Sequence, residues 1–249
     1  SQSCRTSFIL EYGSAGYTTP TGASYGSVKR PGQSMPRAHW RQDDPDTMDV
    51  GDVYGGGSPT GITVYENGAL GAAWAGTLLN CEPSRNTVLA YKLAPQKGTY
   101  ALNESTRKDL ITSNPTREFE GTDFHKLKAD SATKPNDRIL FRPSDVTVGP
   151  DGAIYVADWY DSRVGGHQTL DDTCTGAIYR IAPKGFKSVM PKIDLSTVAG
   201  QIAALRNPAP NVRAGGFNRL KAAGDKVVDD VAALEAVAPQ LHAVTQSLS

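Results

Sequence analysis

Two stretches of the chain share one pattern, and this repeat constrains the fold more than any other feature. Residues 59–68 read PTGITVYENG, and residues 143–152 read PSDVTVGPDG. Each contains a Pro, a small polar residue, alternating apolar residues, a turn and a Gly. After each copy come a strand-like stretch, a polar corner, a second strand-like stretch and then Ala-Pro and Lys-Gly. A strand–turn–strand unit that recurs with a variable connector is typical of β-propeller blades.

The second copy has the period of a β-hairpin. Val146 and Val148 precede Gly-Pro-Asp-Gly, and Ile154 and Val156 follow it, so apolar residues alternate on both sides of a turn signal. The 25 Gly and 16 Pro residues also favour many short strands over long helices. We therefore expect a mainly β fold built from several blades of antiparallel strands. Because about two blades cannot close a ring, we expect an incomplete propeller and a chain cut from a longer protein.

The period of the apolar residues becomes helical after about residue 190. Ser196 or Thr197 is a good helix N-cap, Asn207 followed by Pro is a stop signal, and Gly224 is a good C-terminal cap. Short helices joined at Pro or Gly corners are typical of HEAT-like repeats. The alternative is an ordinary helical tail that packs on the propeller.

This change of period predicts two domains. Residues 1–190 are expected to form the propeller portion, and residues 191–249 the start of the HEAT-like α-helical segment.

The charge balance and the cysteines exclude several classes of function. The chain has 26 basic and 26 acidic residues, so electrostatics give no reason to expect a nucleic acid or an anionic membrane as a partner. No apolar run approaches the roughly 18 residues of a membrane span. Cys4, Cys81 and Cys174 form no C-x-x-C motif, so they predict neither a zinc site nor covalent haem. They allow one disulfide with an odd thiol, or partners in missing sequence.

The corner that follows the second hairpin is the first candidate site. Asp158, Asp161 and His167 lie there within ten positions, together with Arg163. Carboxylate, imidazole and guanidinium groups together suit a general base and a substrate clamp, so these residues are the candidate catalytic set. The alternative is a β-corner in which the Asp side chains cap backbone N–H groups.

Two further candidates concern a cofactor and a metal ion. Arg142 lies directly before a Pro and a strand start, from which a long side chain can leave the sheet. Asp44, Asp46 and Asp49 crowd one loop and are candidate ligands for calcium, which binds oxygen atoms. Their spacing is not that of an EF-hand, and solvated loop carboxylates are the alternative.

The chain resembles a known family at "FRPSDVTVGPDGAIYVADWYD", "GGH" and "GAIYRIAPKG", and also at "HWRQDDP", "GDVYGGGSPTGITVYENG", "LLNCEPSRN" and "NVRAGGFNRL". These motifs are similar to the planctomycete and verrucomicrobial type of membrane-bound dehydrogenase. In that family a glucose/sorbosone-dehydrogenase-like β-propeller is followed by HEAT repeats and a c-type haem domain. The resemblance implies that the haem domain lies outside this chain.

A more distant resemblance concerns the cofactor. Soluble quinoprotein sugar dehydrogenases carry an Arg-x-Arg-Asp-Val motif whose arginines contact pyrroloquinoline quinone (PQQ). The matching run here begins with Arg142, has Ser144 in place of the second Arg, and continues with Asp145 and Val146. The resemblance therefore implies that Arg142 contacts PQQ, and that the calcium ligands of those dehydrogenases are supplied by the half of the propeller before residue 1.

Two functions follow as expectations, of which we prefer the first and keep the second as the alternative. In the first, the chain is part of a periplasmic or secreted quinoprotein-like dehydrogenase, membrane-associated through missing segments. It would oxidise a sugar or another alcohol or aldehyde and pass electrons to a cytochrome or haem domain in the remainder of the polypeptide or in another subunit. In the second, the propeller and HEAT segment form a non-catalytic scaffold that binds a glycan or a protein partner in a redox complex. Ser144 favours the second.

Overall fold

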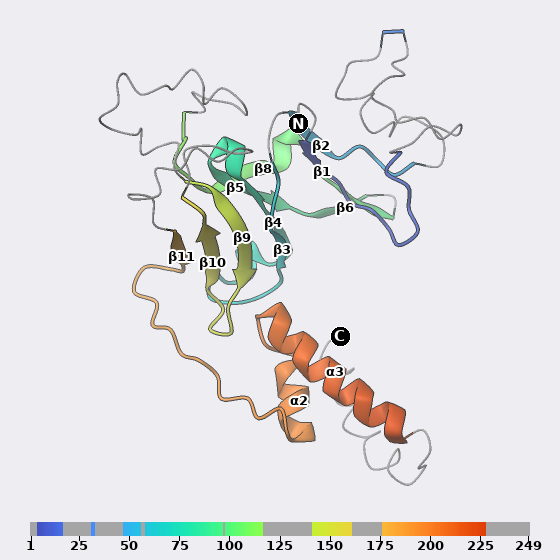
Figure 1. Cartoon of the computed structure of the whole chain (residues 1–249), viewed down its shortest axis with the longest axis vertical. Coiled ribbons are helices and arrows are strands. Elements are labelled where there is room, and N and C mark those ends of the chain that lie inside the picture. Colours follow the sequence, from blue (N-terminus) through green and yellow to red (C-terminus); the bar gives the residue numbers. More distant parts are fainter. Residues whose placement is uncertain are drawn as a thin grey trace. The chain divides into compact units, whose positions relative to one another are not determined.

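The structure is a computed structural model of the whole chain (Figure 1). It describes residues 4–16, 31–32, 47–55, 58–96, 98–116, 141–160 and 176–227. Two compact units divide the chain. The first comprises Ser1–Glu66, Ala73–Thr147 and Tyr155–Ile181, and the second comprises Asn67–Ala72, Val148–Ile154 and Ala182–Ser249.

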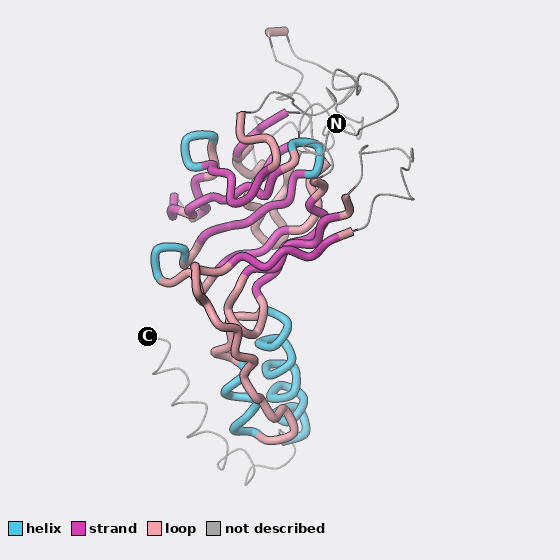
Figure 2. The backbone as a smooth tube through the Cα atoms, turned by 90° about the vertical axis from the view of Figure 1, so that its left-hand side faces the viewer, coloured by secondary structure: helices cyan, strands magenta, loops and turns pink. Residues whose placement is uncertain are grey.

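A four-stranded antiparallel sheet lies at the centre of the first unit. Its strands are arranged in the order β3 (Ile62–Tyr65), β4 (Thr77–Glu82), β5 (Thr87–Lys92) and β8 (Arg107–Thr112). All but one residue of β4 are buried, and so are the first five of β5, so this sheet is covered on both faces. A 3-10 turn, η3 (Pro83–Arg85), joins β4 to β5 and appears as a short cyan segment in Figure 2.

A second sheet contains the other copy of the repeat. Its order is β11 (Ala177–Ile181), β10 (Ile154–Asp158) and β9 (Pro143–Val148). Val146 and Val148 on β9 and Val156 on β10 are buried, as their alternation predicts. The turn between β9 and β10 closes through the N–H of Gly152, which donates to the carbonyl of Gly149 at 2.8 Å.

The two faces of the central sheet meet different partners. On one face, Leu89 and Tyr91 of β5 pack in a core cluster with Cys4 of β1 (Cys4–Thr6) and Tyr54 of β2 (Asp52–Gly55). On the other face lies Cys81, and the charge of Asp145 of β9 raises the pKa of its thiol. A small separate ribbon is formed by β6 (Ala94–Gln96) and β7 (Thr99–Ala101). The central sheet therefore has the β1–β2 ribbon on one side and the β9 sheet on the other.

The two copies of the repeat lie side by side. The N–H of Gly61 donates to the carbonyl of Ser144 at 3.2 Å, and the hydroxyl of Thr60 donates to the carbonyl of Pro143 at 3.0 Å. At the other end of the repeat, within the second unit, the N–H of Ala69 donates to the carbonyl of Gly152 at 2.9 Å. The first strands of the two copies are thus joined at both ends.

Two helices belong to the second unit, α2 (Val198–Ala204) and α3 (Pro210–Val227). The Thr197 side chain caps α2 by accepting the N–H of Gly200, which confirms the predicted N-cap. Gly216 of α3 lies so close to α2 that a Cβ there would be 2.8 Å from that of Ala204. The predicted cap at Gly224 is wrong, because α3 continues through it to Val227. No helix in the described part of the chain is long and apolar enough to span a bilayer.

The mainly β fold with several antiparallel sheets is confirmed. Among the described residues the sheets form no closed ring. The division into residues 1–190 and 191–249 stays a prediction. The second compact unit includes the helices and also the tips of both hairpin repeats.

Candidate functional site

A buried carboxyl group lies at the corner between β4 and β5. The Glu82 side chain has no exposed surface. Its Oε1 accepts the backbone N–H of Ser58 at 2.7 Å and that of Ser84 at 3.3 Å. Its Oε2 is also buried and makes no hydrogen bond of normal geometry within the described part of the chain. Burying a carboxylate oxygen without a hydrogen-bond donor costs free energy, so this corner is chemically unusual.

The environment of Glu82 brings its pKa into the neutral range. Burial raises the pKa of Glu82 to about 7. Its effect is larger than that of three neighbours that lower the pKa, which are the backbone N–H of Ser58, the Tyr54 hydroxyl and the charge of Arg85. Desolvation is the dominant cause because it disfavours the charged form. A carboxyl group that titrates near pH 7 is able both to accept and to release a proton under physiological conditions.

Arg85, at the end of the same corner, lies over an aromatic ring. Its guanidinium carbon is 5.6 Å from the ring centroid of Tyr54, and the guanidinium of Arg107 is 6.0 Å from the same centroid. Arg85 also donates a hydrogen bond to the backbone carbonyl of Tyr54. Both cations are within the range of a cation–π interaction. Burial raises the pKa of the Tyr54 hydroxyl, so it stays protonated.

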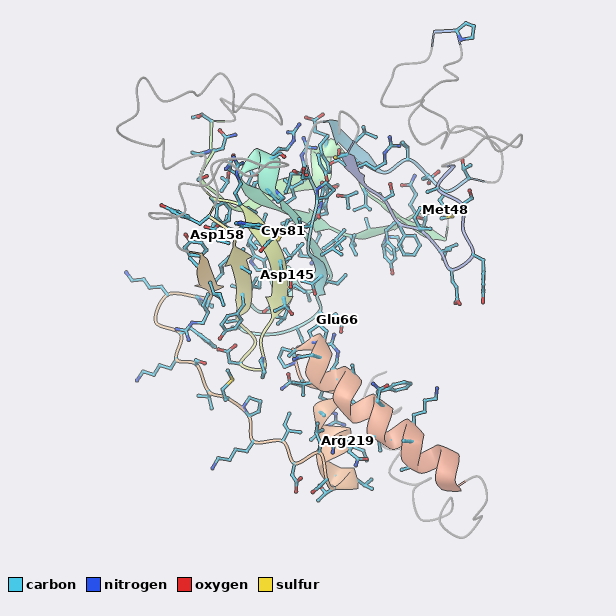
Figure 3. All side chains as sticks on the ribbon, in the orientation of Figure 1. Met48, Glu66, Cys81, Asp145, Asp158 and Arg219 are labelled. Atoms are coloured by element: carbon cyan, nitrogen blue, oxygen red, sulfur yellow. The ribbon has the colours of Figure 1, made fainter. Side chains whose placement is uncertain are left out.

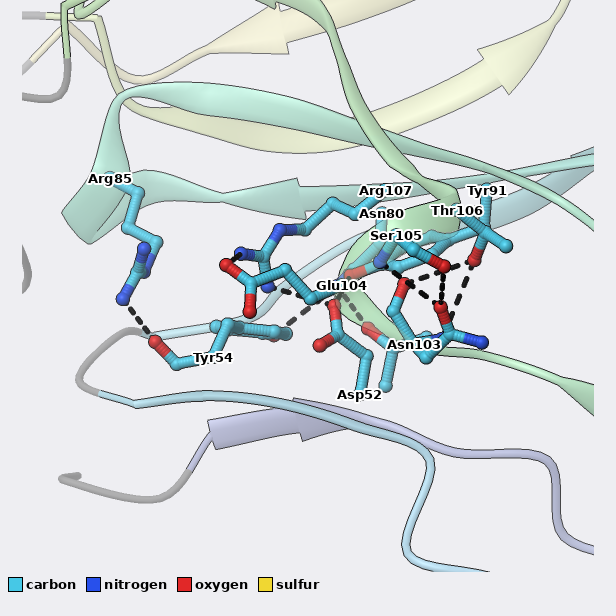
Figure 4. Close-up of polar contacts among 11 residues, drawn as sticks. Asp52, Tyr54, Asn80, Arg85, Tyr91, Asn103, Glu104, Ser105, Thr106 and Arg107 are labelled. Carbon is cyan, nitrogen blue, oxygen red and sulfur yellow. Dashed lines mark hydrogen bonds and ion pairs between the residues drawn. The ribbon is translucent and has the colours of Figure 1, made fainter.

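The second cation belongs to a buried ion pair, shown with its neighbours in Figure 4. Arg107 donates to Asp52 at 2.8 Å, and the exposed fractions of the two side chains are 6% and 4%. The hydroxyl of Tyr91 donates to the same Asp52 oxygen at 2.9 Å. Burial by itself lowers the pKa of Arg107, but the charge and hydrogen bond of Asp52, together with Tyr91 and Glu104, outweigh it and the pKa is raised. This ion pair joins β2 to β8.

Asn80 of β4 belongs to the same layer of buried polar side chains as Asp52, Tyr91 and Arg107. Its side-chain amide donates to the hydroxyl of Thr6 at 3.0 Å and to that of Tyr54 at 3.3 Å. Beside the layer is a small cavity of about 20 Å³, which holds roughly one water molecule. It is lined by Arg85, Thr87, Leu89, Arg107, Asp109, Thr112 and Asn114.

The structure brings together two of the residues that the sequence singles out, Arg142 and Asp158. The backbone N–H groups of Arg142 and Tyr160 both donate to Oδ1 of Asp158, at 2.7 and 2.8 Å. The Arg142 guanidinium donates to the carbonyl of Pro83 at 2.7 Å. Arg142 and Asp158 are each 4% exposed. Asp158 therefore caps a β-corner, and Arg142 joins that corner to the corner of the first repeat.

A second bond joins the same two corners. Asn86, in the left-handed conformation with φ of 54°, donates from its side-chain amide to the carbonyl of Phe141 at 2.7 Å. Asn86 is fully buried. Figure 3 shows Asp158 near the end of β10. We call Glu82, Arg85, Asn86, Arg142 and Asp158 the corner site.

Of the remaining predicted residues, the structure describes Asp49 alone. Asp161, His167, Asp44 and Asp46 lie outside the described residues, and Asp49 is exposed. Across the described ranges, no group of three or more His, Cys, Asp or Glu side chains could hold a metal ion.

Both described cysteines, Cys4 and Cys81, are buried, and they form no disulfide with each other. Cys174 lies outside the described part. Burial, together with the charges of Asp145 and Glu82, raises the pKa of Cys81 to about 12, so this thiol is inert as a nucleophile at neutral pH.

Comparison with known proteins places the corner site and both repeats inside a recognised domain. A family model described as a domain of unknown function (DUF7133) matches residues 23–185. The chain belongs to the DUF7133 family. No curated protein and no solved structure matches the chain.

The DUF7133 region contains functional candidates that sequence reasoning missed. Asp52 and Arg107 are 55 positions apart, and no motif connects them. Glu82 and Arg85 lie in the polar corner "CEPSRN", where their charges were visible. The burial that moves the pKa of Glu82 was not visible, because it comes from β2 and the segment at Ser58.

Proposed function

We propose that this DUF7133 chain contributes consecutive blades to a β-propeller and begins a HEAT-like segment with α2 and α3. Hydrogen bonds between the two copies of the repeat support this proposal. Rotation about a propeller axis brings the same position of neighbouring inner strands together. Gly61 meets Asp145 in this way, and Gly68 meets Gly152. These are the third and tenth positions of the two copies of the repeat.

We propose further that the propeller is a non-catalytic scaffold that binds a glycan or a protein partner, within a periplasmic or secreted redox protein of the dehydrogenase type. One observation carries this proposal: the guanidinium of Arg142 is buried against the carbonyl of Pro83. An arginine that joins two β-corners contributes to the rigidity of the scaffold. Asp158, which caps backbone N–H groups, acts in the same way.

The surroundings of Arg142 do not fit PQQ. With 4% of its surface exposed, Arg142 offers almost no area for a flat quinone to contact. Its guanidinium is occupied by a backbone carbonyl, and Ser144 stands where the related dehydrogenases have a second arginine. We therefore derive no catalytic step through a quinone in this chain.

The test uses the complete protein supplied with calcium and PQQ. We expect no quinone absorption band and no sugar-dependent dye reduction over a panel of sugars and alcohols. On a glycan array, or in pull-downs with the cognate cytochrome, we expect binding without turnover. Quinone-dependent turnover of any sugar or alcohol would overturn the scaffold proposal.

A further inference from the structure

An open cleft of about 370 Å³ lies on the face of the central sheet that carries Cys81, away from the ion pair of Arg107. Strand register forms its floor: Thr77 pairs with Lys92, and Ala90 pairs with Lys108. Ala90 is small, and this leaves room above the sheet. The volume is in the range of ligand pockets, roughly 300–1,000 Å³.

An indole side chain contributes to the lining of the cleft. Trp74 is half-buried in the loop between β3 and β4, and Ala73 beside it also lines the cleft. This loop is held near its end by the N–H of Gly76, which donates to the carbonyl of Tyr65 at 2.8 Å. A fixed aromatic face beside a small set of polar groups is the usual composition of a small-molecule site.

Two lysines also line the cleft. The Lys92 ammonium donates to the carbonyls of Ala73, at 3.2 Å, and of Ala75, which positions the charge and leaves a third N–H for a ligand. Lys108 is exposed on the neighbouring strand. No acidic side chain is among the described residues that line the cleft, which are Ala73, Trp74, Thr77, Ala90, Lys92, Thr106 and Lys108.

We propose that this cleft binds an acidic sugar, in which the ring packs on Trp74 and a carboxylate or sulfate group meets Lys92 and Lys108. This inference deepens the proposed binding function and rests on it. A neutral sugar leaves the two ammonium groups without an anion, and a small free anion leaves the indole without a ring to pack on. The combination of one aromatic wall and two cations selects a ligand that has both features.

The test is calorimetric titration of the full chain with trigalacturonate. Three ligands serve as controls. The fully methyl-esterified form of trigalacturonate lacks only the charge, and acetate has the charge without the sugar ring. Adenosine monophosphate is an aromatic anion. We expect trigalacturonate to bind at least tenfold more tightly than each of these ligands. Lys108→Gln is expected to weaken binding at least fivefold, and Trp74→Ala to abolish it.

Lys187→Gln, which removes an exposed lysine that is not among the residues lining the cleft, is the matched control and is expected to bind as the wild type does. Because Lys108 is exposed, its variant should keep the wild-type thermal midpoint, which separates loss of binding from loss of folding. Equal binding of the ester, of acetate or of adenosine monophosphate would overturn the proposal, and so would full affinity in Lys108→Gln. If the chain binds other glycans on the array but does not bind trigalacturonate, the cleft assignment alone is overturned. Quinone-dependent turnover would overturn the scaffold function.

Discussion

Gly61 and Asp145 occupy the same position in the two copies of the repeat, and their backbones lie in contact. A Cβ at Gly61 would be 2.6 Å from Cα of Asp145 and 2.9 Å from the backbone nitrogen of Val146. Backbone atoms cannot give way as the end of a long side chain can. The glycine is therefore what allows β3 and β9 to approach so closely, and the interface between the two repeats depends on it.

Gly61→Ala should separate the two repeats. We expect the free energy of unfolding to fall by about 2–4 kcal/mol, because the added methyl group meets backbone of the other repeat. Chemical denaturation monitored by tryptophan fluorescence measures this change. The control is Gly224→Ala in α3, where a Cβ meets nothing within 4 Å. It should be neutral or stabilise by up to about 1 kcal/mol. Equal stability of Gly61→Ala and the wild type would contradict the close approach.

Glu82 should make stability depend on pH. Its pKa is about 7 in the folded chain against an ordinary value of 4.5, so the folded state binds more protons than the unfolded state between these values. The free energy of unfolding should therefore fall as the pH rises from 4.5 to 7, by about 3 kcal/mol from this group, and level off above that.

Denaturation curves of Glu82→Gln across the same pH range isolate this contribution. We expect the variant to lose this part of the slope, while Glu11→Gln, at an exposed position, keeps it. A rise in the wild-type minus Glu82→Gln stability difference between pH 4.5 and 7 would show that the sign is wrong.

Replacing only one member of the Asp52–Arg107 ion pair should lower the free energy of unfolding strongly. Removing one charge leaves the other buried, so Asp52→Asn and Arg107→Met should each destabilise by about 3–5 kcal/mol. The double variant should recover part of this loss, because no lone charge remains. Glu104→Gln is the control in the same network: its side chain is 82% exposed, so the effect should be below about 1 kcal/mol. Additive losses in the double variant would argue against the pair.

Asn86 combines a backbone and a side-chain role that two substitutions separate. Asn86→Gly keeps access to the left-handed conformation but loses the bond to Phe141, and should cost about 1–2 kcal/mol. Asn86→Ala also carries the steric cost of that conformation, so it should lose about 1 kcal/mol more. Thermal melts of both variants provide the measurement. An alanine variant as stable as the glycine variant would rule out the conformational part.

The local fold was largely readable in advance. The period-two alternation of Val146, Val148, Ile154 and Val156 predicts β9 and β10, because neighbouring side chains of a strand point to opposite faces. The Gly-Pro-Asp-Gly turn and the cap at Thr197 were readable for the same reason, since each depends on residues close in the chain. Gly224 was misread as a stop because a solvated helix tolerates one glycine at a cost of about 1 kcal/mol.

The corner site was readable only in part. Arg142 and Asp158 stand out in the sequence as charged residues at a corner, but their partners do not. Pro83, whose carbonyl accepts a hydrogen bond from the Arg142 guanidinium, is 59 positions away. Burial rather than charge decides the role of Arg142.

The sequence by itself determined the strands, their turns and the repeat, because these follow from spacing over a few residues. Only the tertiary structure decided that equivalent positions of the two repeats touch, that Arg142 faces a carbonyl rather than solvent, and that Glu82 titrates near neutrality. Each of these depends on what surrounds a group in space, since desolvation and contact are set by segments tens of residues apart.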